Sequence, residues 1–164
     1  MGFFFVYVIT QIFFAKDLEL FGLAFCFIYV NYLLTLPLNT GRASLLLLAF
    51  VMGILVDSFY DTLGIHTAAS VLVAYVRPHL IAFMTGKDEI NELSVKETGW
   101  QWFIGYCVIL VFSHHLLIFL LQQFNFMRLP HTFLKAVAST LFTLFFVMII
   151  QYLFYSPQTS HARK

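Results

Sequence analysis

Two aspartates and three histidines are the residues of this chain whose types and spacing could carry out chemistry. Asp57 and Asp61 lie four residues apart at the end of an apolar run, and His66 follows a short turn. The adjacent pair His114 and His115 lies within another apolar run. Carboxylates and imidazoles gathered in one leaflet of a membrane could bind a metal ion or relay protons. The pattern contains no His-Glu-x-x-His, no paired carboxylates around a nucleophile and no Gly-x-Ser-x-Gly.

These residues are better explained as a polar packing network than as an intramembrane enzyme. Neighbouring residues of a helix point about 100° apart, so His114 and His115 should not both face one site squarely. We expect no catalytic residue, no metal ion and no cofactor. Gln11 and Asn31, also within apolar runs, are expected to form hydrogen bonds between helices.

The composition identifies lipid as the solvent of most of the chain. Of 164 residues, 61% are hydrophobic, 19% are aromatic and only 10% are charged, whereas a soluble domain carries about 25% charged residues. This excludes a soluble enzyme and a disordered tail, and a formal net charge of +1 argues against a nucleic-acid binder. Cys26 and Cys107 lie in apolar runs and are expected to be small buried hydrophobes without a disulfide bond.

The apolar runs predict an all-α integral membrane protein with about six helices in one bundle, forming a single transmembrane domain over residues 1–164. A bilayer core about 30 Å thick needs about 20 apolar residues as a helix. The first run would cover only about 20 Å, so five spans are the alternative, and Pro78 makes the end of the fourth span ambiguous. The six candidate spans are 3–15, 20–37, 43–60, 63–80, 100–121 and 133–154.

The distribution of Lys and Arg favours an orientation with both termini in the cytoplasm. In that orientation the aspartates and histidines named above lie in the outer half of the membrane. The inner side then carries six cations and the outer side three: Arg42, Arg77, Lys87, Lys96, Arg163 and Lys164 against Lys16, Arg128 and Lys135.

The one sizeable polar stretch, Gly86 to Thr98, is either a short amphipathic helix on the inner surface or a solvated loop. Within it, Ser94 and Glu97 fit a capping box that would open the fifth helix.

A helical hairpin around residues 53–68 is the strongest local feature. Gly53, Asp57 and Asp61 share one helical face, and Gly53 would allow a second helix to approach closely. Asp57 would then face protein; the alternative is an interfacial carboxylate that reaches water. The turn ends at Gly64, which forms a small-xxx-small pair with Ala68.

The same residues resemble the bacterial rod shape-determining protein MreD family. The family pattern is Gly-x-x-x-Asp on the third helix, a short turn ending in Leu-Gly, and a small-residue fourth helix closing on Ala-Tyr. In this chain these positions are Gly53, Asp57, Leu63-Gly64 and Ala74-Tyr75. The resemblance covers residues 31–76, and the turn departs from it by carrying Phe59-Tyr60-Asp61 where small residues are common.

The resemblance implies a fold similar to the six-helix substrate-binding subunits (S-components) of energy-coupling-factor vitamin transporters. It also implies a non-enzymatic component of the cell-elongation complex in the bacterial inner membrane. Such a component binds the scaffold protein MreC and, through it, the polymerase RodA, its class B transpeptidase and MreB filaments. Gly53, Asp57, Asp61, Gly64, His66 and Ala68 are the candidate structural and partner-interface residues. A small-molecule-binding transporter subunit is the alternative, and it predicts a wet outward cavity of about 300 Å³ or more with unpaired polar groups.

Overall fold

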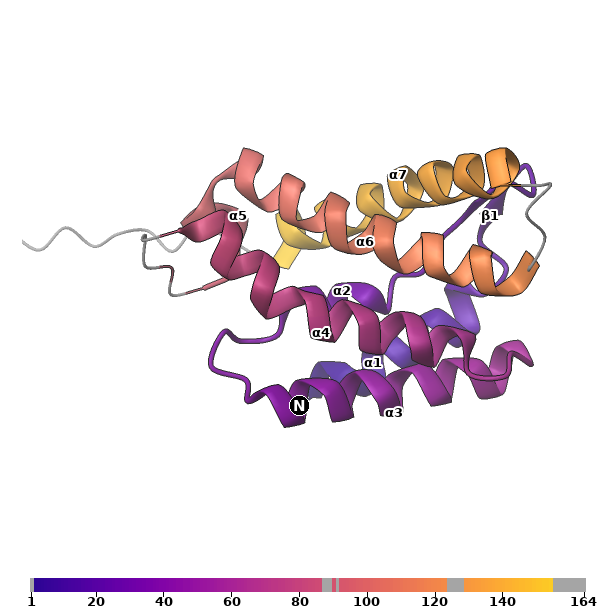
Figure 1. The fold of residues 1–164 in the computed structure, drawn as a ribbon, viewed down its shortest axis with the longest axis horizontal. Coiled ribbons are helices and arrows are strands. Elements are labelled where there is room, and N and C mark those ends of the chain that lie inside the picture. Colours follow the sequence, from indigo (N-terminus) through magenta and orange to yellow (C-terminus); the bar gives the residue numbers. More distant parts are fainter. Residues whose placement is uncertain (1, 87–89, 91, 124–128, 155–164) are drawn as a thin grey trace, which may run out of the picture.

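Four long helices dominate the structure, a computed structural model that describes residues 2–86, 90, 92–123 and 129–154 (Figure 1). Each is long and apolar enough to cross a membrane, as expected for an all-α, multi-pass membrane protein. They are α3 (Arg42–Tyr60), α4 (Ile65–Thr85), α6 (Trp100–Gln123) and α7 (Leu129–Phe154).

These helices confirm four of the predicted helical segments, 43–60, 63–80, 100–121 and 133–154. Pro78 does not end its helix, because α4 continues to Thr85. A proline within a membrane helix is tolerated where neighbouring groups satisfy the freed backbone carbonyl. The first predicted segment is a short helix, α1 (Gly2–Thr10), followed by one π-helical turn, η1 (Gln11–Ala15).

The prediction of one helical span over residues 20–37 is wrong. The chain forms two short antiparallel strands there, β1 (Glu19–Leu20) and β2 (Ala24–Phe25), and then the six-residue helix α2 (Val30–Thr35). Phe21 and Gly22 between the strands both have positive φ angles, 56° and 65°, which a right-handed helix cannot contain. The described residues thus contain four long helices and shorter elements, and the count of six spans is not confirmed.

Side chains from α7 satisfy part of this non-helical backbone. The Phe25 N–H donates to Ser139 Oγ at 2.9 Å, and the Phe27 N–H donates to Thr143 Oγ1 at 3.2 Å. Within a membrane protein, irregular backbone is stable only where protein groups replace the hydrogen bonds of a helix.

Gln11 of η1 forms further hydrogen bonds with the backbone of this non-helical segment, at Cys26 and Tyr29. Its amide nitrogen donates to the Cys26 carbonyl at 3.1 Å and to the Tyr60 hydroxyl at 2.7 Å, and its amide oxygen accepts from the Tyr29 N–H at 3.3 Å. Gln11 was expected to link two helices. It does reach α3 through Tyr60, but it also anchors a segment that is not helical.

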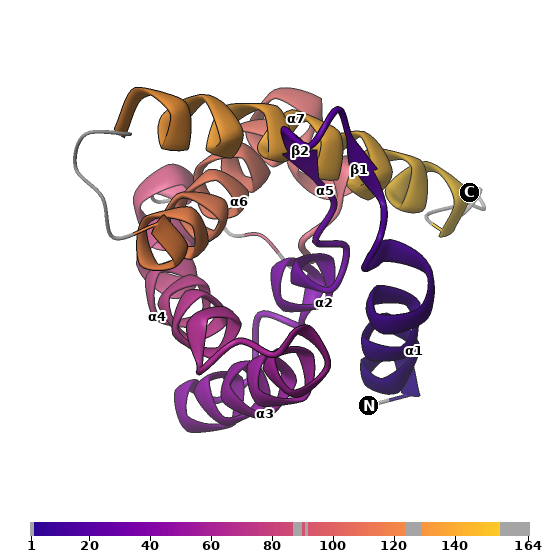
Figure 2. The same cartoon turned by 90° about the vertical axis from the view of Figure 1, so that its right-hand side faces the viewer.

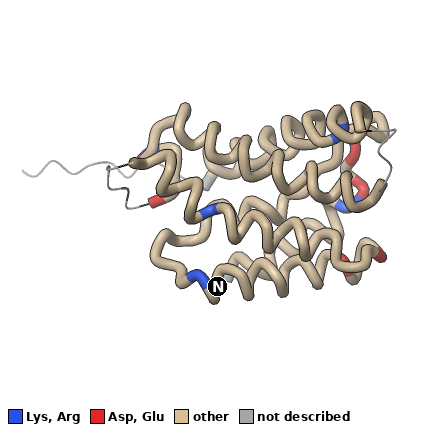
Figure 3. The backbone as a smooth tube through the Cα atoms, viewed as in Figure 1, with Lys and Arg blue, Asp and Glu red and all other residues tan. Residues whose placement is uncertain are grey.

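The core surrounds α2, which lies toward the middle of the end-on view between α1 and the long helices (Figure 2). Tyr29, Leu33 and Leu34 are completely buried there. Aromatic side chains on the outside, such as those of Phe13, Phe14 and Phe145, are well exposed. Charged residues gather toward the two ends of the molecule and leave a largely uncharged middle band (Figure 3). This distribution suits a protein whose middle is surrounded by hydrocarbon.

The predicted cap near residue 94 opens a single turn, α5 (Val95–Thr98), and not the long helix itself. Ser94 Oγ accepts the Glu97 N–H at 3.3 Å. Gly99, at φ 80°, separates α5 from α6. Residues 87–89 and 91 of the polar stretch lie outside the described residues.

Candidate functional site

The turn between α3 and α4 depends on two left-handed backbone conformations. Asp61, at φ 53°, ends α3, and its N–H donates to the Asp57 carbonyl. Gly64, at φ 82°, precedes α4. Glycine adopts this conformation without the steric cost of a Cβ, so Gly64 is required by the turn itself, although open space surrounds it.

The Asp57 carboxylate caps the first turn of α4 from the preceding helix. One oxygen, Oδ1, accepts from Thr62 Oγ1 at 2.5 Å, from the His66 N–H at 2.9 Å and from His66 Nδ1 at 3.0 Å. The other, Oδ2, accepts from the Thr67 N–H at 2.9 Å and from Thr67 Oγ1 at 2.6 Å. These backbone N–H groups have no partner within their own helix. Asp57 is 6% exposed and therefore faces protein.

Gly53 lies one turn earlier in α3, directly against the backbone of α4. A Cβ at this position would lie 2.3 Å from Thr67 Cα and 2.8 Å from Thr67 N. Because both atoms belong to the backbone, neither can rotate away. Gly53 thus sets the distance between α3 and α4, and this distance allows Asp57 to reach the start of α4.

The structure brings together only part of the predicted site. Gly53, Asp57 and His66 are buried in one contact between α3 and α4, whereas Asp61, Gly64 and Ala68 are exposed. Gly64 and Ala68 therefore form no packed pair within the chain. Their small side chains face outward.

Behind this contact, the three predicted histidines surround one aromatic ring. His66, His114 and His115 are completely buried, and their rings lie 5.3, 5.9 and 5.2 Å from that of Phe27. His114 and His115 were expected not to face one site squarely; their rings are inclined at 73° to each other, and both nevertheless lie against Phe27. The Phe27 ring is broad enough to touch both, even though the two side chains leave α6 in different directions.

Hydrogen bonds fix the histidines individually. His115 Nδ1 lies 2.7 Å from the Val111 carbonyl and must carry the proton, so Nε2 accepts from Thr143 Oγ1, 3.2 Å away. His114 Nε2 lies 2.6 Å from the Tyr29 hydroxyl.

The hydrogen bonds of this histidine cluster are incomplete. His66 Nε2 and His114 Nδ1 have no hydrogen-bond partner among the described residues. Across the same part of the chain, no group of three or more His, Cys, Asp or Glu residues is placed to hold a metal ion.

A shallow depression of about 410 Å³ lies on the hairpin end. Its polar residues are largely bonded to one another, since Thr62 and Thr67 both donate to Asp57. Asp61 contributes an exposed carboxylate. The depression is lined by Ile54, Asp57, Ser58, Asp61, Thr62, Leu63, Gly64 and Thr67.

Arg77 has a different position from the one expected. It was counted among cations of the inner surface, but the structure places it within α4 and 2% exposed. Its guanidinium donates to the Leu36 carbonyl and to the Tyr106 hydroxyl, and that hydroxyl donates to the Leu34 carbonyl. The positive charge thus lies at the C-terminal end of α2, where a helix favours cations. The position of Arg77 inside an apolar run was the feature of the sequence that could have predicted a buried, paired arginine.

Comparisons with known proteins provide no relative for this site. No family model, no curated protein and no solved structure matches the chain.

Proposed function

We propose that this chain is a non-enzymatic partner protein of the bacterial cell-elongation complex in the inner membrane, with both termini in the cytoplasm. It binds MreC and links it to RodA, the class B transpeptidase and, indirectly, MreB. The proposal originates in the resemblance of residues 31–76 to the MreD family. The observation that carries it is the role of Gly53 and Asp57, the two most specific motif positions: both build the α3–α4 hairpin.

The polar groups of the hairpin support a structural role over catalysis. All five short contacts of the Asp57 carboxylate are made to its own chain. A general base or a metal ligand needs a lone pair directed at a substrate or an ion. We therefore assign to Asp57 the structural role of capping the start of α4, and we assign no catalytic role to any residue of the hairpin.

The outer face of α4 supports a partner interface. Ala68 on α4 and Gly64, which directly precedes this helix, are both exposed, and small residues four positions apart let a second membrane helix approach closely. Tyr75, one heptad after Ala68, is 61% exposed on the same helix. We propose that a membrane helix of MreC packs along this face, defined here as the α4 face.

The alternative is a small-molecule-binding subunit similar to an S-component. The depression on the hairpin end exceeds the expected 300 Å³, which favours it. The mutual hydrogen bonds of Asp57, Thr62 and Thr67 weigh against it, because a ligand site needs unpaired polar groups that converge. The partner function therefore has the stronger support.

A pull-down of the tagged chain from its native membrane in mild detergent, analysed by mass spectrometry, tests the proposal. An Asp57→Asn copy is compared with an Asp61→Asn copy at equal abundance. We expect MreC, RodA or the transpeptidase with the unaltered chain and with Asp61→Asn, and reduced recovery with Asp57→Asn. Recovery of a transmembrane coupling protein with paired ATPases would overturn the proposal and favour the transporter subunit.

A further inference from the structure

A cavity of about 550 Å³ lies between α1, α2 and the C-terminal end of α7, away from the hairpin. It runs inward from an exposed rim to a buried floor. Phe3 and Val6 on α1 are 67% and 55% exposed, whereas Asn31 on α2 is completely buried. The space is within the range of pockets that bind small ligands. Its lining residues are Phe3, Val6, Tyr7, Thr10, Ile28, Asn31, Tyr32, Thr35, Leu36, Pro37, Ile150 and Gln151.

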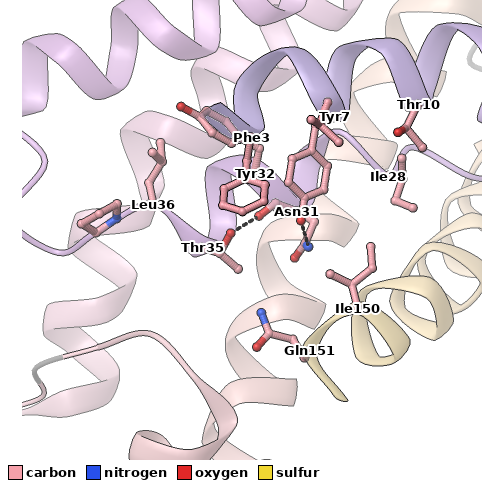
Figure 4. A pocket seen from close by; sticks show the side chains of 12 residues that line it. Phe3, Tyr7, Thr10, Ile28, Asn31, Tyr32, Thr35, Leu36, Ile150 and Gln151 are labelled. Atoms are coloured by element: carbon pink, nitrogen blue, oxygen red, sulfur yellow. Dashed lines mark hydrogen bonds between the residues drawn. The ribbon is translucent and has the colours of Figure 1, made fainter. Parts of the chain in front are cut away.

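Two carboxamides from distant parts of the chain converge on this cavity (Figure 4). Asn31 donates through Nδ2 to the Tyr7 hydroxyl at 2.8 Å, but its Oδ1 has no hydrogen-bond partner among the described residues. Gln151 is 3% exposed, and its Oε1 also has no hydrogen-bond partner among the described residues. Buried polar atoms are normally paired, so each exception calls for an explanation. Two exceptions on one cavity point to a shared ligand.

The lining residues define the chemistry of that ligand. None of the twelve residues carries a charge, so a phosphate, carboxylate or ammonium group inside the cavity would be unpaired at high cost. Most of the wall is apolar, which suits a hydrocarbon chain. The two free carbonyl oxygens accept hydrogen bonds, which suits a hydroxyl or an amide N–H.

We infer that this cavity binds one uncharged membrane amphiphile, an acyl or similar hydrocarbon chain whose polar head carries two hydrogen-bond donors, one for Asn31 Oδ1 and one for Gln151 Oε1. A monoacylglycerol, whose head carries two hydroxyl groups, is a molecule of this kind. The inference goes beyond the proposed function and does not depend on it, because the α4 face lies on a different helix.

A helix of a partner protein fits this cavity less well. A membrane helix with its side chains is about 10–12 Å across. Asn31 and Gln151 are buried within their own chain, so the backbone of such a helix would stay outside the cavity. A partner helix would reach them only through a long polar side chain, whereas a single lipid chain can pass the exposed rim at Phe3 and Val6.

Equilibrium binding of radiolabelled 1-monooleoylglycerol to the purified full chain tests the inference, with methyl oleate as a probe that has a similar chain and no hydrogen-bond donor. Gln151→Met removes the amide and keeps the side-chain length, and Gln101→Met is its control at an exposed position of α6. Val6→Trp blocks the rim, and Phe5→Trp is its control on the neighbouring exposed position of α1. Equal melting temperatures show that the variants remain folded.

We expect saturable monooleoylglycerol binding that is about a hundredfold tighter than methyl oleate binding, the effect of two hydrogen bonds of ordinary strength. Gln151→Met should weaken monooleoylglycerol binding about tenfold, Val6→Trp should abolish it, and both controls should bind like the unaltered chain. Equal affinity for the two probes, or unchanged binding in Val6→Trp, would overturn the inference. So would photocrosslinking of position 6 to a membrane protein and to no lipid in native membranes.

Discussion

At the scale of single residues, hydrogen is the only side chain that position 53 accepts. A Cβ there would lie 2.3 Å from Thr67 Cα, so Gly53→Ala must push α3 and α4 apart. We expect a loss of about 2–3 kcal/mol in the free energy of unfolding, typical of overpacking. Gly105→Ala is the matched control, because a Cβ at that helical position meets only the flexible end of Met84 at 3.6 Å. Unfolding in mixed micelles measures both, and equal stability of the two variants would refute this role of Gly53.

Asp57 provides a second comparison between neighbouring positions. In Asp57→Asn, one carboxylate oxygen becomes an NH₂ group that faces the N–H groups of α4. Donors then face donors, so we expect unfolding to become easier by about 2–3 kcal/mol. Asp61→Asn alters an exposed carboxylate and should change stability by less than about 0.5 kcal/mol. Unfolding in mixed micelles measures the stability of both variants. An Asp57→Asn variant as stable as Asp61→Asn would show that the cap is dispensable.

The sequence could predict Gly53 and Asp57, because their spacing places them on one helical face within an otherwise apolar run. It could not predict what Asp57 binds. The His66 and Thr67 N–H groups reach the carboxylate only because Asp61 and Gly64 reverse the chain with positive φ angles. Nor could a helical pattern show that Ala68 points outward, since that depends on which face of α4 meets α3.

At the scale of elements, the segment from residue 19 to 29 shows the limit of hydropathy. An apolar run of that length equally fits a buried helix or a buried extended stretch. Residues more than a hundred positions away stabilise the extended form here. The hydroxyl groups of Ser139 and Thr143 on α7 accept hydrogen bonds from the backbone N–H groups of Phe25 and Phe27. No local propensity carries that information.

Thr143→Val tests this support with almost no change in shape. It leaves the Phe27 N–H without its partner, so we expect a loss of about 1–2 kcal/mol in stability. Amide hydrogen exchange should also become faster in residues 24–29. Thr140→Val is the matched control, since Thr140 is buried on the same helix but donates only to the Ala136 carbonyl of its own turn. Equal exchange in the two variants would mean that α7 does not hold this segment.

At the scale of the whole molecule, the orientation in the membrane is a prediction that labelling can test. If both termini are cytoplasmic, the α3–α4 turn is outside and the start of α3 is inside. A membrane-impermeant maleimide should label Asp61→Cys in intact cells and Arg42→Cys only after permeabilisation. The native Cys26 and Cys107 are 1% and 0% exposed, so the folded protein should give little background. The reverse labelling pattern would invert the proposed orientation.

We propose that the α4 face binds a partner protein of the elongation complex. The most direct measurement is photocrosslinking in native membranes from Ala68, with Leu141 on α7 as a control that is 65% exposed. We expect a crosslink to MreC from position 68 and none from position 141. Crosslinks to MreC from position 141 alone, or from neither position in membranes that contain MreC, would contradict it.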